Sequence, residues 1–95
     1  MGRAEFKVPG GKLMAAETEV EDGRLVNVKI TGDFFMHPEE AIEELEDMLI
    51  GLHVDASAIE DAVEEFFRGH SIELIGASPR DFIHVLKMSL EVSSS

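Results

Sequence analysis

The segment Pro9–Lys12, with the sequence PGGK, has the residue types of a phosphate-binding turn, because backbone N–H groups beside a lysine can surround an anion. A complete P-loop also needs a glycine five residues before its Gly-Lys pair and a serine or threonine after the lysine. Phe6 and Leu13 occupy those two positions. A P-loop also opens a helix, whereas this segment precedes a strand pattern. A turn that leads into a strand is therefore the favoured interpretation.

The sequence gives little support for metal chemistry. The four histidines show neither i, i+4 spacing nor an HExxH arrangement; they are His37, His53, His70 and His84. The chain contains no cysteine, which excludes disulfides, thiolate catalysis and thiolate metal ligands. We expect no metal site.

Acidic side chains crowd the predicted helix that follows Pro38. Two carboxylates there have the chemistry to exchange protons or to hold a divalent cation. However, they lie on the face opposite Ile42, Leu45 and Leu49, so a solvated helix face is the favoured interpretation. The residues are Glu39, Glu40, Glu43, Glu44, Glu46 and Asp47. No residue of the chain is predicted to be catalytic.

Phe34, Phe35 and Met36 are three large apolar residues in a row between a strand and a helix. Three consecutive side chains cannot all face one small core, so at least one ring is expected near the surface. An exposed aromatic residue often anchors a protein partner. The segment is a candidate partner interface, with core filling as the favoured alternative.

Alternating side chains predict two strands, over residues 12–21 and 24–31. The dipeptide Asp22-Gly23 between them favours a tight antiparallel hairpin. In the second strand, Val26, Val28 and Ile30 are expected to share the buried face. Residues 71–75 form a short apolar stretch, interpreted as a strand or an extended link.

Three helices are predicted from apolar spacing and end signals. The first begins at Pro38 and ends at Gly51, and the second begins near Asp55 or Ser57 and ends at Gly69. Ser78 and Pro79 then start the third, which carries Phe82, Ile83, Val85, Leu86 and Leu90 on its buried stripe.

These elements predict an α+β fold: a small antiparallel sheet of two to three strands, with an N-terminal hairpin and about three helices packed on one side. We expect a single domain over residues 1–95. Residues 1–11 are expected to form an extended arm and turn, and residues 91–95 a frayed tail.

Composition narrows the possible functions. The 95 residues include 8 Lys+Arg and 20 Asp+Glu, a formal net charge of −12. A chain of this length is too short for an ordinary complete nucleotide-dependent enzyme. Its acidity argues against nucleic acid, whose affinity comes from clustered lysine and arginine. No apolar run is long enough for a membrane span or secretory segment, so a cytoplasmic protein is expected.

The order of several segments resembles the C-terminal accessory domain of lipoate–protein ligases. The segments are KVPGGKLM, EVEDGRLVNVKITGDFF, the acidic helix and IGASPRDF. The resemblance extends from about Glu5 to Leu90. In this family, a larger catalytic domain makes lipoyl-adenylate from lipoate and ATP, and then passes the lipoyl group to a lysine of an acceptor domain.

The resemblance implies an accessory subunit of a bipartite ligase, because this chain begins at Met1 and contains no catalytic domain. The alternative is a piece cut from a longer protein. The implied partners are a catalytic ligase subunit, as a heterodimer, and indirectly the lipoyl-acceptor domains. ATP, Mg and lipoate are implied for the complex, with none bound by this chain alone. An alternative function is a non-catalytic binding module that recruits the acceptor protein or regulates a partner.

Within that resemblance, Lys7, Gly10, Gly11 and Lys12 are the expected contacts to the nucleotide or adenylate. Formation of an acyl-adenylate develops charge that cations and a dry site stabilise. Two lysines that flank a glycine pair are natural donors in an otherwise acidic protein.

A second resemblance concerns the fold alone. A strand that ends at Gly32, a short loop and a helix that closes at Gly51 are similar to iron–sulfur scaffold proteins. Those proteins assemble clusters on cysteines, so this cysteine-free chain shares at most their architecture.

Overall fold

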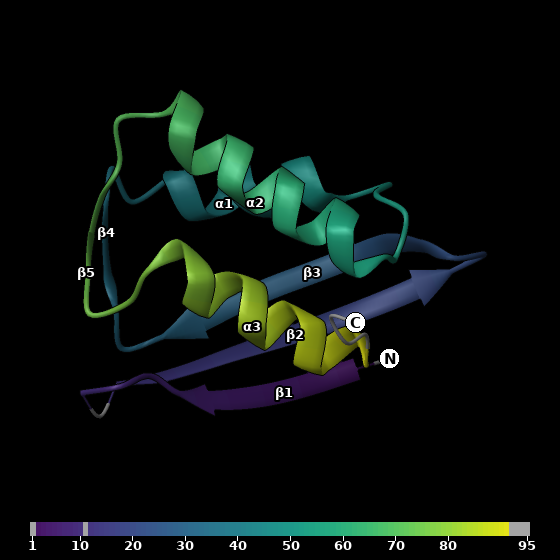
Figure 1. Cartoon of the computed structure of the whole chain (residues 1–95), viewed down its shortest axis with the longest axis horizontal. Helices are drawn as coiled ribbons and strands as arrows, with labels where there is room; N and C mark the ends of the chain where they lie inside the picture. The colour runs from purple at the N-terminus through teal and green to yellow at the C-terminus, as the bar shows by residue number, and fades with distance from the viewer. Residues whose placement is uncertain (1, 11, 92–95) are drawn as a thin grey trace.

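The computed structural model describes residues 2–10 and 12–91. Its main sheet has three antiparallel strands in the order β1-β2-β3: β1 is Gly2–Lys7, β2 is Leu13–Glu21 and β3 is Arg24–Gly32 (Figure 1). The predicted hairpin is confirmed as β2 and β3. Asp22 and Gly23 have φ angles of 54° and 75°, the positive values that a two-residue type I′ turn requires.

The pairing of β2 with β3 contains a β-bulge that the alternation pattern did not predict. Glu19 pairs with Asn27 but Val20 pairs with Leu25, so Val26 is an extra residue without a partner on β2. One extra residue reverses the alternation of side chains beyond it. Leu25 is therefore buried, and Val26 is 43% exposed rather than buried beside Val28.

The N-terminal segment is a paired strand rather than an arm. β1 aligns antiparallel with β2 from Gly2↔Thr18 to Lys7↔Leu13. Phe6 of β1 packs against His84, with ring centroids 4.3 Å apart, which fixes the strand to the last helix. Of the tail predicted at residues 91–95, only Glu91 lies within the described residues, as the C-cap of that helix.

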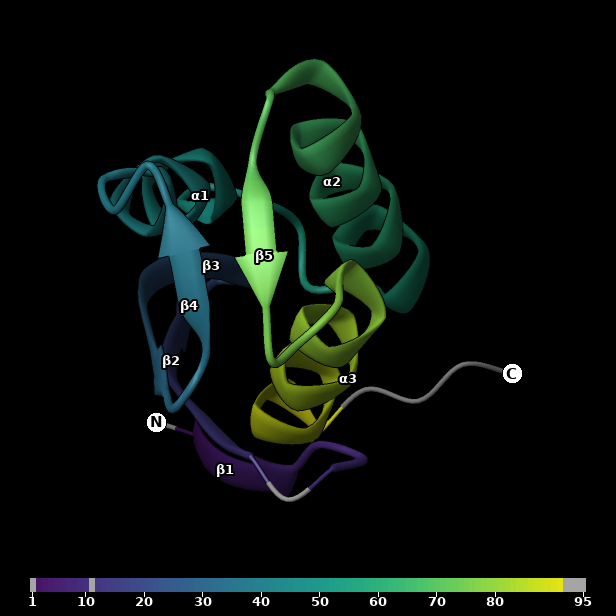
Figure 2. The same cartoon turned by 90° about the vertical axis from the view of Figure 1, so that its left-hand side faces the viewer.

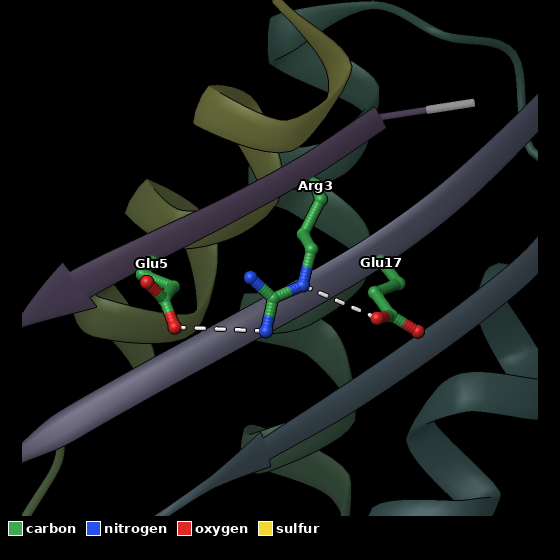
Figure 3. A network of polar contacts seen from close by, with 3 residues as sticks. All are labelled: Arg3, Glu5 and Glu17. Carbon is green, nitrogen blue, oxygen red and sulfur yellow. Dashed lines mark hydrogen bonds and ion pairs between the residues drawn. The ribbon is translucent and has the colours of Figure 1, made fainter.

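The outer face of the three-stranded sheet is polar and carries an ion-pair network (Figure 3). Arg3 Nη2 lies 3.5 Å from Glu5 Oε2, and Arg3 Nε donates to Glu17 Oε1 at 3.2 Å. All three side chains are more than half exposed, so the network contributes little to stability.

A second, two-stranded sheet joins β4, Phe35–His37, to β5, Glu73–Ile75. β5 lies inside the apolar stretch predicted at 71–75, whereas β4 was not predicted. Each strand places one side chain inward, Met36 on β4 and Leu74 on β5, and these two residues pair directly. Three-residue strands are too short to show an alternating pattern.

The helices are α1, Ala41–Leu49, α2, Ala56–Gly69, and α3, Pro79–Leu90. α1 begins later than predicted, because Pro38 contributes to a preceding turn in which its carbonyl accepts the Ala41 N–H. At the start of α2, the Asp55 side chain accepts the Ala58 N–H at 3.1 Å, as expected of an N-cap. The predicted start of α3 at Ser78 is also confirmed.

The helices lie in two layers over one face of the three-stranded sheet (Figures 1 and 2). α3 packs on β1 and β2, α1 packs on β3, and α2 packs on α1 and α3. The hydrophobic core lies between the sheet and the helices and contains side chains from every helix. Its largest fully buried side chains are those of Phe82, Met14, Leu25, Leu45, Leu49, Ile59 and Leu86. The α+β architecture predicted from the sequence is confirmed.

Helix length and polarity also bear on the membrane question. Across the described residues, no helix is both long enough and apolar enough to cross a bilayer.

Gly32, at the end of β3, lies where two backbone segments approach closely. A Cβ atom there would lie 2.6 Å from the Leu13 carbonyl oxygen and 2.9 Å from a ring carbon of Phe34. We predict that Gly32→Ala lowers the free energy of unfolding by about 1–3 kcal/mol, the usual cost of overpacking. Thermal denaturation measures this loss.

The matched control is Gly69→Ala at the end of α2, where a Cβ would have no heavy atom within 4 Å. This control is expected to keep or raise the melting temperature, because alanine restricts the unfolded chain. Equal melting temperatures for the two variants would show that the close approach at Gly32 is not a constraint.

Candidate functional site

The turn between β1 and β2 contains the residues predicted to contact a nucleotide. The Val8 N–H donates to the Lys12 carbonyl at 2.7 Å, and the Val8 side chain is buried, which anchors the turn to the core. Gly10 has a φ of 106°, a value that favours glycine. Gly11 lies outside the described residues.

The side chains of Lys7 and Lys12 are exposed on either side of this turn. Neither has an ion-pair partner within residues 2–10 and 12–91. Both ammonium groups are therefore free to meet an anion carried by another molecule.

The start of α3 lies against the same turn and encloses a hollow of about 450 Å³. Pro9, Gly10 and Lys12 line one part of it, and Gly76, Ala77 and Asp81 line another. Gly76 has a φ of 89°, and a Cβ atom on it would lie 3.6 Å from Lys12 Cγ. The aliphatic part of Lys12 is thus held beside the loop that precedes α3.

The N-terminus of α3 already has an anion from its own chain. The Ser78 N–H donates to Asp81 Oδ2 at 2.7 Å, and the Ser78 hydroxyl donates to the same oxygen at 3.0 Å. A carboxylate at a helix N-terminus is stabilised by the helix dipole. The hollow therefore combines a lysine with a carboxylate, and its cationic donor is the Lys12 side chain rather than the helix end.

The structure separates the three residues of the predicted interface. Phe34 packs edge-on against Phe82 at 5.1 Å, and Met36 is only 5% exposed, so both contribute to the core. Phe35 is 53% exposed and pairs across the ribbon with Ile75, which is 56% exposed. Sequence reasoning missed Ile75, because the three residues of β5 are too few to show an alternating pattern.

The turn between β1 and β2 and the predicted interface segment Phe34–Met36 lie at the same end of the fold. Figure 2 views the molecule from this end, with β4 and β5 facing the viewer and the turn between β1 and β2 below them. Gly76 connects the turn and the segment, because a Cβ atom on it would lie 3.5 Å from the Phe34 Cα and 3.6 Å from Lys12 Cγ.

The acidic helix α1 is mostly solvated, with one exception. Glu46 Oε2 accepts the backbone N–H of Ile30 at 2.7 Å, which satisfies a donor on the edge strand β3. Glu46 therefore has a structural role, contrary to its assignment to a purely solvated face.

The histidines have separate environments. His70 stacks on Phe66 and lies 3.7 Å from Glu44, His84 packs on Phe6, and the backbone of His53 forms an isolated antiparallel β-bridge with that of Arg24. No group of three His, Asp or Glu side chains in the described part of the chain is placed to hold a metal ion.

Comparison with known proteins identifies relatives of this chain. The family model for the bacterial lipoate protein ligase C-terminus matches residues 3–86. Lipoate-protein ligase A subunit 2 of Thermoplasma acidophilum is 34% identical over 76 residues, which cover 80% of this chain and 78% of that protein.

A solved structure is also similar. It belongs to a study of an archaeal lipoylation system, a bi-partite lipoate protein ligase and its E2 lipoyl domain from Thermoplasma acidophilum. The match has a TM-score of 0.74 and 30% identity, and it covers 88% of this chain and 96% of that chain. Since the family model covers most of the sequence, this chain belongs to the family of bacterial lipoate protein ligase C-terminal domains.

Proposed function

We propose that this chain is the accessory subunit of a two-component lipoate–protein ligase and is required for ATP-dependent activation of lipoate by a separate catalytic subunit. The observation that carries the proposal is the match to a relative that is itself a second subunit, of which this chain covers 78%. The similar structure, from a bi-partite ligase, supports the same assignment.

In this proposal the accessory chain completes a site that lies mainly on the catalytic subunit. Lipoyl-adenylate forms when the lipoate carboxylate attacks the α-phosphate of ATP, with loss of pyrophosphate. A small domain that closes over the site excludes water and adds donors to the developing charge. Lys7 and Lys12 are exposed and unpaired within the described residues, which suits this role.

Magnesium and the substrates are assigned to the catalytic subunit. Mg²⁺ is usually held by one or two carboxylates together with substrate phosphates, so in this proposal it accompanies the ATP on the catalytic subunit. The two lysines and the backbone near Gly10 suit an anionic ligand instead.

An alternative function is recruitment of the lipoyl-acceptor protein without any role in adenylation. The presence of an E2 lipoyl domain in the system to which the similar structure belongs is the observation that favours it. The two functions act on different steps, so separate assays of the steps distinguish them.

The first test is reconstitution with the catalytic ligase subunit from the same genome. We predict that omission of this chain abolishes lipoyl-adenylate formation and leaves transfer from premade lipoyl-adenylate largely intact. Pyrophosphate release measures the first step, and lipoylation of the acceptor domain measures the second. Loss of transfer alone would support recruitment and contradict the activation role.

The second test reverses the charge of the two candidate donors. We predict that Lys7→Glu/Lys12→Glu lowers the rate of adenylate formation by about a hundredfold to a thousandfold, the range observed when a preorganised donor is lost. The rate is measured at saturating accessory subunit, so that weaker association does not mimic slower chemistry.

The matched control is Lys29→Glu/Arg68→Glu, which makes the same change in net charge at exposed positions on β3 and α2. This control is expected to retain the wild-type rate. If both double variants behaved alike, net charge rather than the turn between β1 and β2 would determine the rate.

A further inference from the structure

The outward face of the β4–β5 ribbon carries an apolar pair that nothing in the described chain covers. We infer that this face, centred on Phe35 and Ile75 and bordered by Lys12, is the surface by which the chain docks on the catalytic ligase subunit. The inference rests on the proposed function and adds to it the contact surface and the positioning residue Gly76. We call Lys12, Phe35, Ile75 and Gly76 the end surface.

The exposure of Phe35 and Ile75 is a consequence of strand geometry. Side chains alternate between the two faces of a strand, and the inward positions are filled by Met36 and Leu74. Phe35 and Ile75 are directly paired across the two strands and are the two most exposed large hydrophobic residues of the described chain. A paired aromatic and aliphatic side chain is typical of an interface anchor.

The surface beside this pair is hollowed. A groove of about 310 Å³ lies between Phe35 and the end of β3, lined by Ile30, Gly32, Phe34 and Ile42. A partner side chain seated in this groove would contact Phe35 on one flank. Gly76 links the groove to the hollow at Lys12, because a Cβ atom on it would lie 3.5 Å from the Phe34 Cα. The end surface therefore offers apolar contacts and a lysine, with Glu39 lining the groove and Asp81 lining the hollow.

Gly76 sets the arrangement of the end surface. A Cβ atom on it would lie 3.5 Å from the Phe34 Cα and 3.6 Å from Lys12 Cγ, and its φ of 89° is disfavoured for other residues. The turn at Gly76 therefore places Ile75 beside Lys12 and beside the segment that carries Phe35.

Position and charge point to the catalytic subunit as the occupant, because the end surface lies beside the turn whose Lys12 is proposed to reach the adenylate on that subunit. Residues 39–67, which include α1 and most of α2, contain eleven acidic residues and no lysine or arginine. A partner that covered this surface would strip water from many carboxylates, which is unfavourable. The same carboxylates would repel bound ATP. The end surface instead has Lys12 beside an apolar pair. Lys12 complements the substrates proposed to lie on the catalytic subunit, a nucleoside triphosphate and a carboxylate, because both are anions.

The experiment measures the dissociation constant for the purified catalytic subunit from the same genome. Phe35→Ser and Ile75→Ser are each expected to raise it at least tenfold, and the double variant by less than the product of the two, because the paired side chains fill one contact. The control is Val26→Ser, which replaces another exposed apolar side chain by serine at a 43% exposed position on the β3 bulge. This control is expected to leave the dissociation constant unchanged. Thermal denaturation of each variant verifies folding.

A Gly76→Ala variant tests the positioning role. We expect weaker association and a lower rate of adenylate formation, with partial rescue by Gly76→Asn, since asparagine tolerates positive φ better than alanine. Equal effects of alanine and asparagine would contradict this role.

The outcomes separate the inference from the proposed function. If the wild-type chain does not bind the catalytic subunit, the proposed function fails. If it binds and the Phe35 and Ile75 variants bind equally well, only the end surface is refuted. A second copy as occupant would appear as a dimer of the isolated chain that Phe35→Ser dissociates. Loss of acceptor-domain binding alone would assign the surface to that protein; either result overturns the inference.

Discussion

The close approach of three backbone segments at one end of the sheet is the constraint on which the rest of the structure depends. Gly32 lets β3 end against the Leu13 carbonyl, and the Asp33 N–H donates to that carbonyl at 2.9 Å. Gly76 lets the loop before α3 turn with a φ of 89°, which brings this loop beside Phe34 and Lys12. These contacts link the β1–β2 turn, the β4–β5 ribbon and the start of α3, which otherwise belong to distant parts of the sequence.

The acidic surface of α1 and α2 and the end surface differ in charge. The acidic surface of α1 and α2 accounts for much of the net charge of −12 and would attract a basic partner over a distance that shortens as salt rises. The desolvation cost of contact would be lower at the end surface, where an apolar pair lies beside a lysine. In the proposed complex, long-range attraction and short-range contact would therefore use different faces of the same small domain.

The features that were predictable from the sequence are those with local causes. Asp22-Gly23 specifies its own turn, and Asp55 and Ser78 cap the helices that follow them directly. The β4–β5 pairing and the bulge at Val26 have no local cause, because each depends on a partner strand. For the same reason the sequence pointed to the segment Phe34–Met36 as a candidate interface without selecting Phe35, and it missed Ile75.

Hydrogen–deuterium exchange of this chain, free and bound to the catalytic subunit, directly tests which end of the fold faces the partner. The central claim is that the end of the fold formed by β4, β5 and the start of α3 faces the partner while the acidic layer stays in solvent. If this end docks on the partner, we expect slower exchange on binding at residues 33–37 and 73–78 and unchanged exchange over α1 and α2. Protection of α1 and α2 with no change at that end would contradict it.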